Sequence, residues 1–269
     1  MPEPAAPPFV TFTADFGPVA TAVCRGVVLT IAPAATVMDL TADVPAFDVR
    51  AGSLALWYSL PWLPVGVHVG IVDPGVGTDR LGVAVEAARG DVLVGPDNGL
   101  LIPAAERLGG IRRAHALENP DLRLPVVTAT FHGRDVFAPA AAHLAAGVEI
   151  SAFGRALDPS ALVRLPAVRP EMVEHGVAVE VVSVDSFGNL YLGGAPANLM
   201  PALGSLTAGR RLRVDDLEVS WAETFGKVRP GEALLFEDSD GQLCLALNQA
   251  SAAERLGLRQ GDRLVIRAT

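Results

Sequence analysis

The chain has little of what marks several large protein classes. It has two cysteines, Cys24 and Cys244, which lie far apart and match no metal-ligand spacing, so we expect small core residues in a reducing compartment. It has no basic run, and its net charge of -9 argues against a nucleic-acid partner. The dinucleotide motif G-x-G-x-x-G, the phosphate-binding P-loop and the hydrolase motif G-x-S-x-G are all absent.

Targeting and membrane signals are also missing. The start Met1-Pro2-Glu3-Pro4 lacks the basic region and apolar run of a signal peptide, so we expect a cytoplasmic protein. The stretch 51–72 carries no Asp, Glu, Lys or Arg, but Pro61 and Pro64 interrupt it, and lipid would leave the broken backbone bonds unsatisfied. The sequence therefore predicts a helix that ends near Leu60, then a turn and a buried strand, and no membrane partner.

What the chain does contain predicts a folded protein of two parts. Of its 269 residues, 50% are hydrophobic and 19% charged, which is enough for a sizeable core. Up to about residue 150, β-type runs alternate with helical segments, which predicts a mostly parallel sheet with flanking helices. The predicted strands are 9–13, 36–40, 65–72, 82–87 and 91–95, and the predicted helices are 19–31, 47–60, 100–108 and 136–146. Asp43 and Pro45 are taken as the start signal of the second helix.

The pattern changes after Leu165. A polar connection with Pro166 and Pro170 precedes a series of short β-like runs, which indicates a small β-barrel or sandwich. We therefore predict an α/β domain at 1–165 and a smaller β domain at 166–269. The predicted strands are 177–184, 211–214, 218–221, 233–236, 243–247 and 263–267, and one short helix is expected at 251–256.

Three strings in the first domain place ionisable or amide side chains on turns after predicted strands. They are Val72 to Arg80, Gly95-Pro96-Asp97-Asn98-Gly99 and Thr130 to Asp135. In α/β proteins such loops build the functional site, so the sequence predicts an enzyme.

Each of these residues also has a purely structural interpretation, and so does Asp15, which follows the first predicted strand. Asp15 could bind the vicinal diol of a ribose, or it could cap the next helix. Asp73 and Arg80 could form a buried ion pair, and the Pro-Asp-Asn-Gly string suits a tight turn. His132 could be a general base, a hydrogen-bond donor or a metal ligand. A metal site would recruit Asp73, Asp135 and His143, but no paired ligand spacing supports it, and we expect no metal.

The second domain has its own dense string, Val184-Asp185-Ser186-Phe187-Gly188-Asn189-Leu190-Tyr191. It groups a carboxylate, an amide and two aromatic rings around one glycine. A second cluster, Asp238 to Gly241, precedes a strand that ends at Asn248. Either string could bind a ligand or simply form a hairpin turn.

Taken in order, these strings resemble the S-adenosyl-L-methionine hydroxide adenosyltransferase family, relatives of the fluorinase and chlorinase enzymes. The resemblance runs through Ala14 to Gly17, Val72 to Arg80, Pro96 to Leu100, Phe131 to Phe137, Asp185 to Asn189 and Ser239 to Asn248. It implies an α/β domain followed by a β-barrel, and a homotrimer with sites between neighbouring subunits. It also implies hydrolysis of S-adenosyl-L-methionine (SAM) to adenosine and L-methionine, with SAM as a substrate and no cofactor.

The resemblance assigns a role to individual residues. Asp73, Arg80 and His132 match the triad of the water-using branch, and Asp15 matches the carboxylate that holds the ribose hydroxyls. Phe47 matches an aromatic that packs on the nucleoside, Asp185 the carboxylate that binds the methionine amine, and Asn189 the amide that reads adenine. The remaining binding positions are implied at Gly133, Phe187, Tyr191, Ser239 and Asn248.

The chemistry suits these residue types. A sulfonium is a good leaving group, so the demand is to present water in line with the ribose C5′ carbon in a dry pocket. We expect Arg80 to keep Asp73 ionised, Asp73 or Arg80 to hold the water, and His132 to polarise it or accept its proton. Two alternatives stay open. One is a halide-using SAM-dependent halogenase, which the charge of Asp73 disfavours, and the other is a non-catalytic nucleoside- or SAM-binding protein, which the short loop 18–24 supports.

Overall fold

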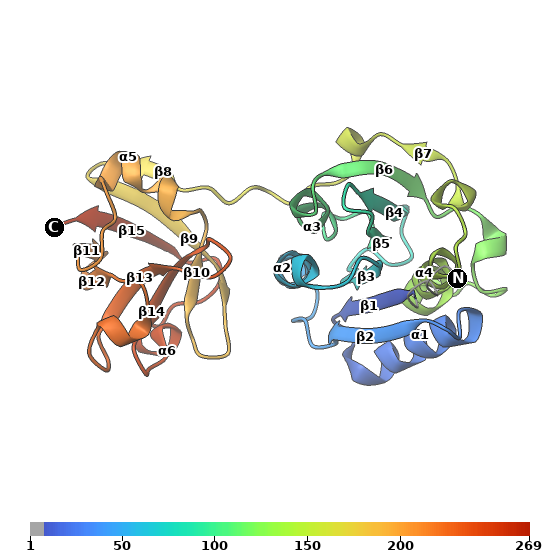
Figure 1. Ribbon diagram of the computed structural model, residues 1–269, viewed down its shortest axis with the longest axis horizontal. Helices are drawn as coiled ribbons and strands as arrows, with labels where there is room; N and C mark the ends of the chain where they lie inside the picture. Colours follow the sequence, from blue (N-terminus) through green and yellow to red (C-terminus); the bar gives the residue numbers. More distant parts are fainter. Residues whose placement is uncertain (1–7) are drawn as a thin grey trace, which may run out of the picture. The chain divides into compact units, whose positions relative to one another are not determined.

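The computed structural model describes residues 8–269 and separates into two compact units, Met1–Leu165 and Pro166–Thr269 (Figure 1). Each unit has its own sheet and its own hydrophobic core. We describe the two units separately.

A seven-stranded sheet forms the centre of the first unit, with the strand order β2-β1-β3-β5-β4-β6-β7. The strands β2, β1, β3 and β5 run parallel, whereas β4 is antiparallel to both β5 and β6, and β7 is antiparallel to β6. The expected mostly parallel α/β sheet is thus confirmed. The strands are β1 (Phe9–Ala14), β2 (Thr36–Thr41), β3 (Val67–Ile71), β4 (Gly82–Ala87), β5 (Val92–Pro96), β6 (Ile111–Ala116) and β7 (Ala156–Leu157).

Helices cover both faces of this sheet. The helix α1 (Gly17–Ile31) and the helix α4 (Ala138–Ala145) pack with β1 in one core cluster, which includes the buried Phe12 and Cys24. On the other face, α2 (Val49–Ser59) and α3 (Ile102–Arg107) pack in a second cluster around Leu56. The sheet therefore has helices on both faces, as the alternation of strands and helices in the sequence predicts.

Several predicted boundaries in this unit are wrong. The second helix does not begin at Phe47, because Asp48 is its N-cap and accepts a hydrogen bond from the backbone N–H of Ala51 at 2.9 Å. Phe47 instead has a left-handed backbone with φ 67°. The last helix starts as a π-turn at Gly133–Phe137, and β6 and β7 were not predicted.

The uncharged stretch 51–72 folds as expected. The helix α2 ends at Ser59, a 3₁₀ turn follows at Leu60–Trp62, and β3 is completely buried. Among residues 8–269, no helix is long and apolar enough to cross a membrane.

The second unit is a closed β-barrel. Its sheet order is β10-β14-β13-β12-β11-β15-β9-β8, and an additional pairing between β9 and β10 closes the ring. Its interior is an aliphatic cluster that includes Val179, Leu212 and Leu245. The strands are β8 (Glu171–Val173), β9 (Gly176–Val184), β10 (Leu190–Leu192), β11 (Arg211–Val214), β12 (Leu217–Trp221), β13 (Ala233–Glu237), β14 (Leu243–Leu247) and β15 (Arg263–Ala268).

The sequence missed three elements of the barrel unit. The strands β8 and β10 have three residues each, too few to show an alternating pattern. The helix α5 (Met200–Leu203) accompanies the expected α6 (Ala252–Leu256), so the prediction of a single helix was wrong. Cys24 and Cys244 are free and buried, which fits their expected role as small core residues.

Candidate active site

The predicted residues of the first unit meet where parallel strands end. Asp15 directly follows β1, and Asp73 follows β3 with one residue between. Since β1 and β3 are adjacent and parallel, their carboxyl ends open at the same edge of the sheet. A small cavity of about 100 Å³ lies there. Its lining is Asp15, Phe16, Phe47, Ile71, Asp73, Val76, Thr130, Phe131, His132 and Gly133.

Asp73, Arg80 and His132 form one hydrogen-bonded network. Arg80 Nε donates to both carboxylate oxygens of Asp73 at 3.0 Å, and Arg80 Nη2 forms a further ion pair with Asp73 Oδ2. The same Nη2 lies 2.8 Å from His132 Nδ1. The side chains of Arg80 and Asp73 are 12% and 7% exposed, so the ion pair is largely shielded from water. The three residues come from two separate loops and are brought together as the sequence predicts.

This geometry fixes the tautomer of His132. A guanidinium can only donate, so Nδ1 of His132 must be the acceptor and its proton must reside on Nε2. Burial and the nearby Arg80 lower the pKa of His132 below its ordinary value. The imidazole is therefore neutral near pH 7 and presents an N–H donor on its Nε2 side.

The loop that carries His132 is tied to the buried Asp135. Asp135 Oδ2 accepts hydrogen bonds from Thr128 N at 2.8 Å and Thr128 Oγ1 at 2.7 Å, while Oδ1 accepts one from Arg134 Nε at 2.6 Å. Burial alone would raise the pKa of Asp135, but these bonds from Arg134 and Thr128 hold it below its usual value. An ionised Asp135 thus closes the loop 128–135, with His132 inside it.

Asp15 organises the rim of the same cavity. Its Oδ2 accepts a hydrogen bond from the backbone N–H of Phe47 at 2.9 Å, which holds Phe47 in its left-handed conformation. Phe47 lines the rim of the cavity and is 73% exposed to solvent. The N-cap of α1 is Phe16, so the helix-capping interpretation of Asp15 is wrong. Its other oxygen, Oδ1, makes no hydrogen bond to the described part of the chain and is available for a ligand.

In the second unit, Asp185 organises a turn. Its Oδ1 accepts hydrogen bonds from the backbone N–H groups of Phe187 and Asn189, each at 2.9 Å. Its Oδ2 accepts one from Asn189 Nδ2 at 2.8 Å, and Gly188 takes φ 79° at the tip. The turn thereby fixes the Asn189 side chain and leaves its carbonyl oxygen free of the Asp185 contact.

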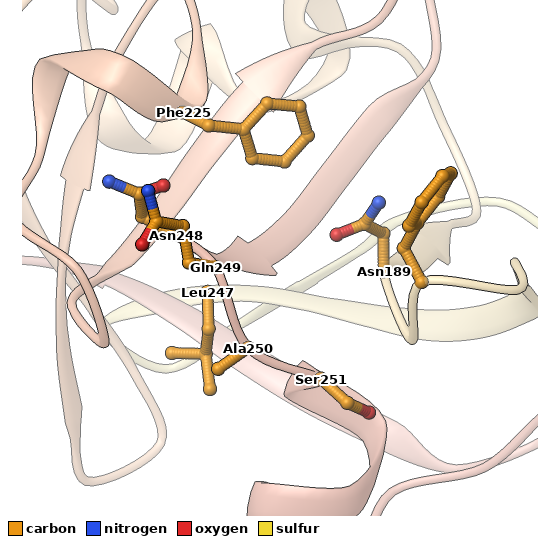
Figure 2. A pocket seen from close by; sticks show the side chains of 8 residues that line it. Asn189, Phe225, Leu247, Asn248, Gln249, Ala250 and Ser251 are labelled. Carbon is orange, nitrogen blue, oxygen red and sulfur yellow. The ribbon is translucent and has the colours of Figure 1, made fainter.

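Asn189 lines a larger cavity of about 500 Å³ (Figure 2). Figure 2 shows Asn189 on one side of this cavity and Asn248 with Gln249 on the other. Asn248 Nδ2 donates to the carbonyl of Val228 at 2.7 Å, which anchors that side. The complete lining is Phe187, Asn189, Phe225, Leu247, Asn248, Gln249, Ala250 and Ser251. A mostly apolar cavity with amide groups at its edges suits a heteroaromatic ring.

Five of these lining residues were missed from the sequence. Leu247 ends β14, and Gln249, Ala250 and Ser251 follow it without an ionisable side chain to attract attention. Phe225 lies in a 3₁₀ turn after β12. The signal that could have found them is the amide-rich Asn248-Gln249 pair directly after a buried strand.

Three predicted binding residues line neither cavity. They are Asp185, which organises the turn beside Asn189, and Tyr191 and Ser239. Tyr191 sits on β10 between Leu190 and Leu192, which face the barrel core, so its side chain packs on the other side with Phe236 and Cys244. Burial raises the pKa of Tyr191 to about 12. Ser239 is exposed on the turn between β13 and β14. A ligand role for any of the three residues stays a prediction.

No metal site emerges in the part of the chain that the structure describes. Residues 8–269 contain no group of three or more His, Cys, Asp or Glu side chains able to hold an ion. The cluster imagined around Asp73, Asp135 and His143 does not form, because Asp73 pairs with Arg80 and Asp135 with Arg134.

The fold defines a class: a protein with an α/β unit and a β-barrel unit, each of which contains a cavity. The chain matches the SAM hydroxide adenosyltransferase N-terminal domain over residues 10–154 and the corresponding C-terminal domain over residues 179–265. It belongs to the SAM hydroxide adenosyltransferase family.

Three relatives illustrate this membership. The chain is 46% identical to an (R)-S-adenosyl-L-methionine hydrolase of Salinispora tropica, covering 97% of this chain and 98% of that protein. It is 28% identical to a fluorinase of an Actinoplanes species, covering 94% and 95%. A crystal structure of an uncharacterized conserved protein from Thermotoga maritima superposes with a TM-score of 0.85 at 32% identity, covering 96% and 99%.

Proposed function

We propose that this protein hydrolyses SAM to adenosine and L-methionine. The observation that carries the proposal is the shielded Asp73–Arg80–His132 network at a cavity whose rim holds Asp15. The 46% identity to a hydrolase over nearly the whole chain supports the same substrate and reaction.

In the proposed reaction, water attacks the ribose C5′ carbon opposite the sulfur. The C5′–O bond forms, the C5′–S bond breaks, and the bonding electron pair leaves with sulfur as the neutral thioether of methionine. One proton of the water is released. Because the sulfonium is already an activated leaving group, the reaction needs no acid at sulfur and no cofactor. Charge is dispersed at the transition state, so a dry cavity favours it.

The tautomer of His132 supports a division of roles. Its Nε2–H would donate a hydrogen bond to the attacking water and hold it in line, while Arg80 keeps its Nδ1 occupied. Asp73 is then the acceptor for the proton. A carboxylate suffices as this acceptor, because water becomes a strongly acidic oxonium as it bonds to carbon.

The binding residues fall into two groups, one in each unit. Asp15 Oδ1 would accept a hydrogen bond from the ribose diol beside the exposed Phe47 ring. Asn189 and the amide side of the barrel cavity would receive the adenine ring. The cavity of the first unit, about 100 Å³, is well below the 300–1,000 Å³ typical of a small-molecule pocket, so it encloses only part of SAM.

We also propose that the protein acts as a cytoplasmic homotrimer, in which the first unit of one protomer and the barrel unit of its neighbour bind the same SAM molecule. The division of ligand-type residues between two units supports this assembly. Light scattering should give three times the chain mass of 28.0 kDa. A monomer with full activity would contradict the shared site.

The proposed activity is tested by product analysis. SAM should disappear with equal amounts of adenosine and methionine formed, and the Asp73→Asn variant should lose most of this turnover. A halide-using enzyme would instead form a 5′-halo-5′-deoxyadenosine when chloride or fluoride is supplied. We do not expect that product, because the carboxylate of Asp73 places negative charge at the cavity. Tight SAM binding without either product would identify a non-catalytic binding protein.

A further inference from the structure

The string Gly95-Pro96-Asp97-Asn98-Gly99 has no role in the proposed reaction so far. It connects β5 to the segment before α3, and none of its residues lines the catalytic cavity. It nevertheless contacts the residue before and the residue after the loop 73–80, which carries Asp73 and Arg80.

The first contact is made by the Asn98 side chain. Asn98 Nδ2 donates a hydrogen bond of 2.8 Å to the carbonyl oxygen of Val72, the residue directly before Asp73. Asn98 Oδ1 accepts one of 3.2 Å from the backbone N–H of Leu100. The amide orientation is fixed by both bonds, since only the nitrogen can donate and only the oxygen can accept. Val72 is fully buried, so no bulk water can replace the lost donor.

The second contact lies at the other end of the same loop. The backbone N–H of Asp97 donates a hydrogen bond of 2.9 Å to the carbonyl of Leu81, the residue directly after Arg80. Two consecutive residues, Asp97 and Asn98, thus hold the two flanks of the loop 73–80.

The string is itself held rigidly. Asp97 Oδ1 accepts a hydrogen bond of 2.9 Å from the backbone N–H of Val163. Gly99 has φ 93°, and a Cβ there would lie 2.8 Å from the backbone nitrogen of Leu165. The segment 163–165 therefore also contacts this turn, in addition to the loop 73–80.

We propose that Asn98 is a positioning residue, which holds the backbone before Asp73 so that Asp73 and Arg80 meet His132 in the geometry needed to place the attacking water. The inference rests on the proposed hydrolysis. It assigns Asn98 no contact with substrate; its effect passes through the Val72 carbonyl to the adjacent Asp73.

The test uses Asn98→Asp, which keeps the acceptor for Leu100, removes the donor to Val72 and adds a negative charge. Asn98→Ser is a second variant without added charge, whose shorter side chain can still bond the turn but cannot reach Val72. The matched control is Asn119→Asp. Asn119 makes the same kinds of hydrogen bond elsewhere, although it is more exposed. Its Nδ2 donates to the carbonyl oxygen of Ala152 at 2.9 Å, and its Oδ1 accepts from the backbone N–H of Asp121 at 3.0 Å.

We expect kcat for SAM to fall by about 10- to 100-fold in both Asn98 variants, because small misplacements of reacting groups cost this much. KM should change by less than about threefold, since Asp15 and the barrel cavity are untouched. Asn119→Asp should keep the kcat of the unaltered protein. An equal kcat in the Asn98 and Asn119 variants, or a loss expressed in KM alone, would overturn the proposal.

A second readout needs no substrate and therefore separates this inference from the proposed function. The chain has five histidines, so their imidazole Cε1–H signals can be resolved after selective ¹³C labelling. In the Asn98 variants the His132 signal should shift, because Arg80 moves at its Nδ1, while His143 and His175 stay in place. In Asn119→Asp the His132 signal should not move. An unchanged His132 signal in the Asn98 variants would overturn the positioning role even if the protein proved not to hydrolyse SAM.

Discussion

Arg80 Nη2 donates a hydrogen bond of 2.8 Å to His132 Nδ1 while the same guanidinium binds both oxygens of Asp73. Arg80 is thus the centre of the network, because it bonds to both partners. Its bond to Nδ1 leaves His132 as a donor through Nε2. The guanidinium also lies over the ring of Phe137, with its central carbon 5.2 Å from the ring centroid, which adds a cation–π contact on the protein side.

The donor role of His132 can be separated from a base role by two substitutions. The amide nitrogen of glutamine can take the place of Nε2–H, whereas alanine supplies no donor. The kcat of His132→Gln should therefore exceed the kcat of His132→Ala by about 10-fold or more, within the range that general acid–base groups contribute. Steady-state kinetics with SAM gives the comparison. Equal loss in both variants would favour His132 as the proton acceptor.

The neutral state of His132 predicts a loss of activity at low pH. Burial and Arg80 lower its pKa below the ordinary 6.5, so the imidazole stays neutral at and above pH 7. As the pH falls through the lowered pKa, the protonated ring can no longer accept the Arg80 bond and repels the guanidinium. The kcat/KM for SAM should be level above neutrality and decline only at pH values below 6.5. A decline that begins above pH 7 would contradict this assignment.

The same shift predicts how stability depends on pH. Between the lowered folded pKa and the unfolded value near 6.5, the unfolded chain binds more protons than the folded chain. The free energy of unfolding therefore rises with pH across this window, and the contribution of His132 is lost as the pH falls below 6.5. Urea unfolding of His132→Gln should show a weaker loss of stability on acidification than the unaltered protein. An identical pH dependence would show that His132 is not shifted.

Asp15 is expected to contribute to nucleoside binding in two ways, by its own oxygen and by holding Phe47. Asp15→Ala should weaken adenosine binding by about 2–4 kcal/mol, the range of one or two charge-assisted hydrogen bonds. Asp15→Asn should lose less, because its oxygen can still accept the Phe47 bond. Asp185→Ala should also weaken adenosine binding, because Asp185 holds the Asn189 side chain that lines the barrel cavity. Calorimetry with adenosine tests these variants, and unchanged affinity in Asp15→Ala would remove Asp15 from the site.

Part of the site of the first unit was predictable because Asp15 and Asp73 are carboxylates that follow the buried strands β1 and β3. The structure places both at one cavity with His132. The strand expected before Thr130 does not form, since no strand lies between β6, which ends at Ala116, and the π-turn at Gly133–Phe137. The state of His132 was not predictable, because it depends on which Arg80 nitrogen reaches which ring nitrogen. The start of α2 was misplaced for a related reason. Both Asp43 and Asp48 can cap a helix, and only the contact between Asp15 and Phe47 decides where the chain turns.

The barrel cavity was predicted less completely. Asn189 and Asn248 stood out as amides near turns, but Gln249 and Phe225 reach the cavity from segments that have no distinctive pattern. The closure of the barrel depends on β10, whose three residues pair with both β9 and β14. The pairing of β10 with β14, which lies much further along the chain, leaves no local signal in the sequence.

A buried ion cluster at the other edge of the first sheet is expected to stabilise the fold without affecting catalysis. Asp91 accepts hydrogen bonds from Arg89 at 2.7 and 2.8 Å and contacts His68 Nε2 at 3.0 Å. Burial alone would raise the pKa of Asp91, but Arg89 and His68 hold it well below its ordinary value. Its contribution is thus complete above the unfolded pKa and is lost only in strong acid.

Asp91→Asn should therefore lower the free energy of unfolding at pH 7 by about 3 kcal/mol, because it leaves buried partners unmatched. The control is Glu118→Gln, which breaks the solvent-exposed pair with Arg155 and should lower the free energy of unfolding far less. Urea unfolding gives both values. The kcat of folded Asp91→Asn should be unchanged, since Asp91 lies before β5 and the catalytic loops follow the opposite ends of the strands. Equal costs for the two variants would contradict the role of the cluster.

In the proposed reaction, water held by His132 and Asp73 attacks the C5′ carbon of SAM. Turnover in ¹⁸O-enriched water, followed by mass spectrometry of both products, tests this attack most directly. We expect one ¹⁸O atom in adenosine, on the 5′-hydroxyl, and none in methionine. Label in methionine, or adenosine formed without label, would contradict it.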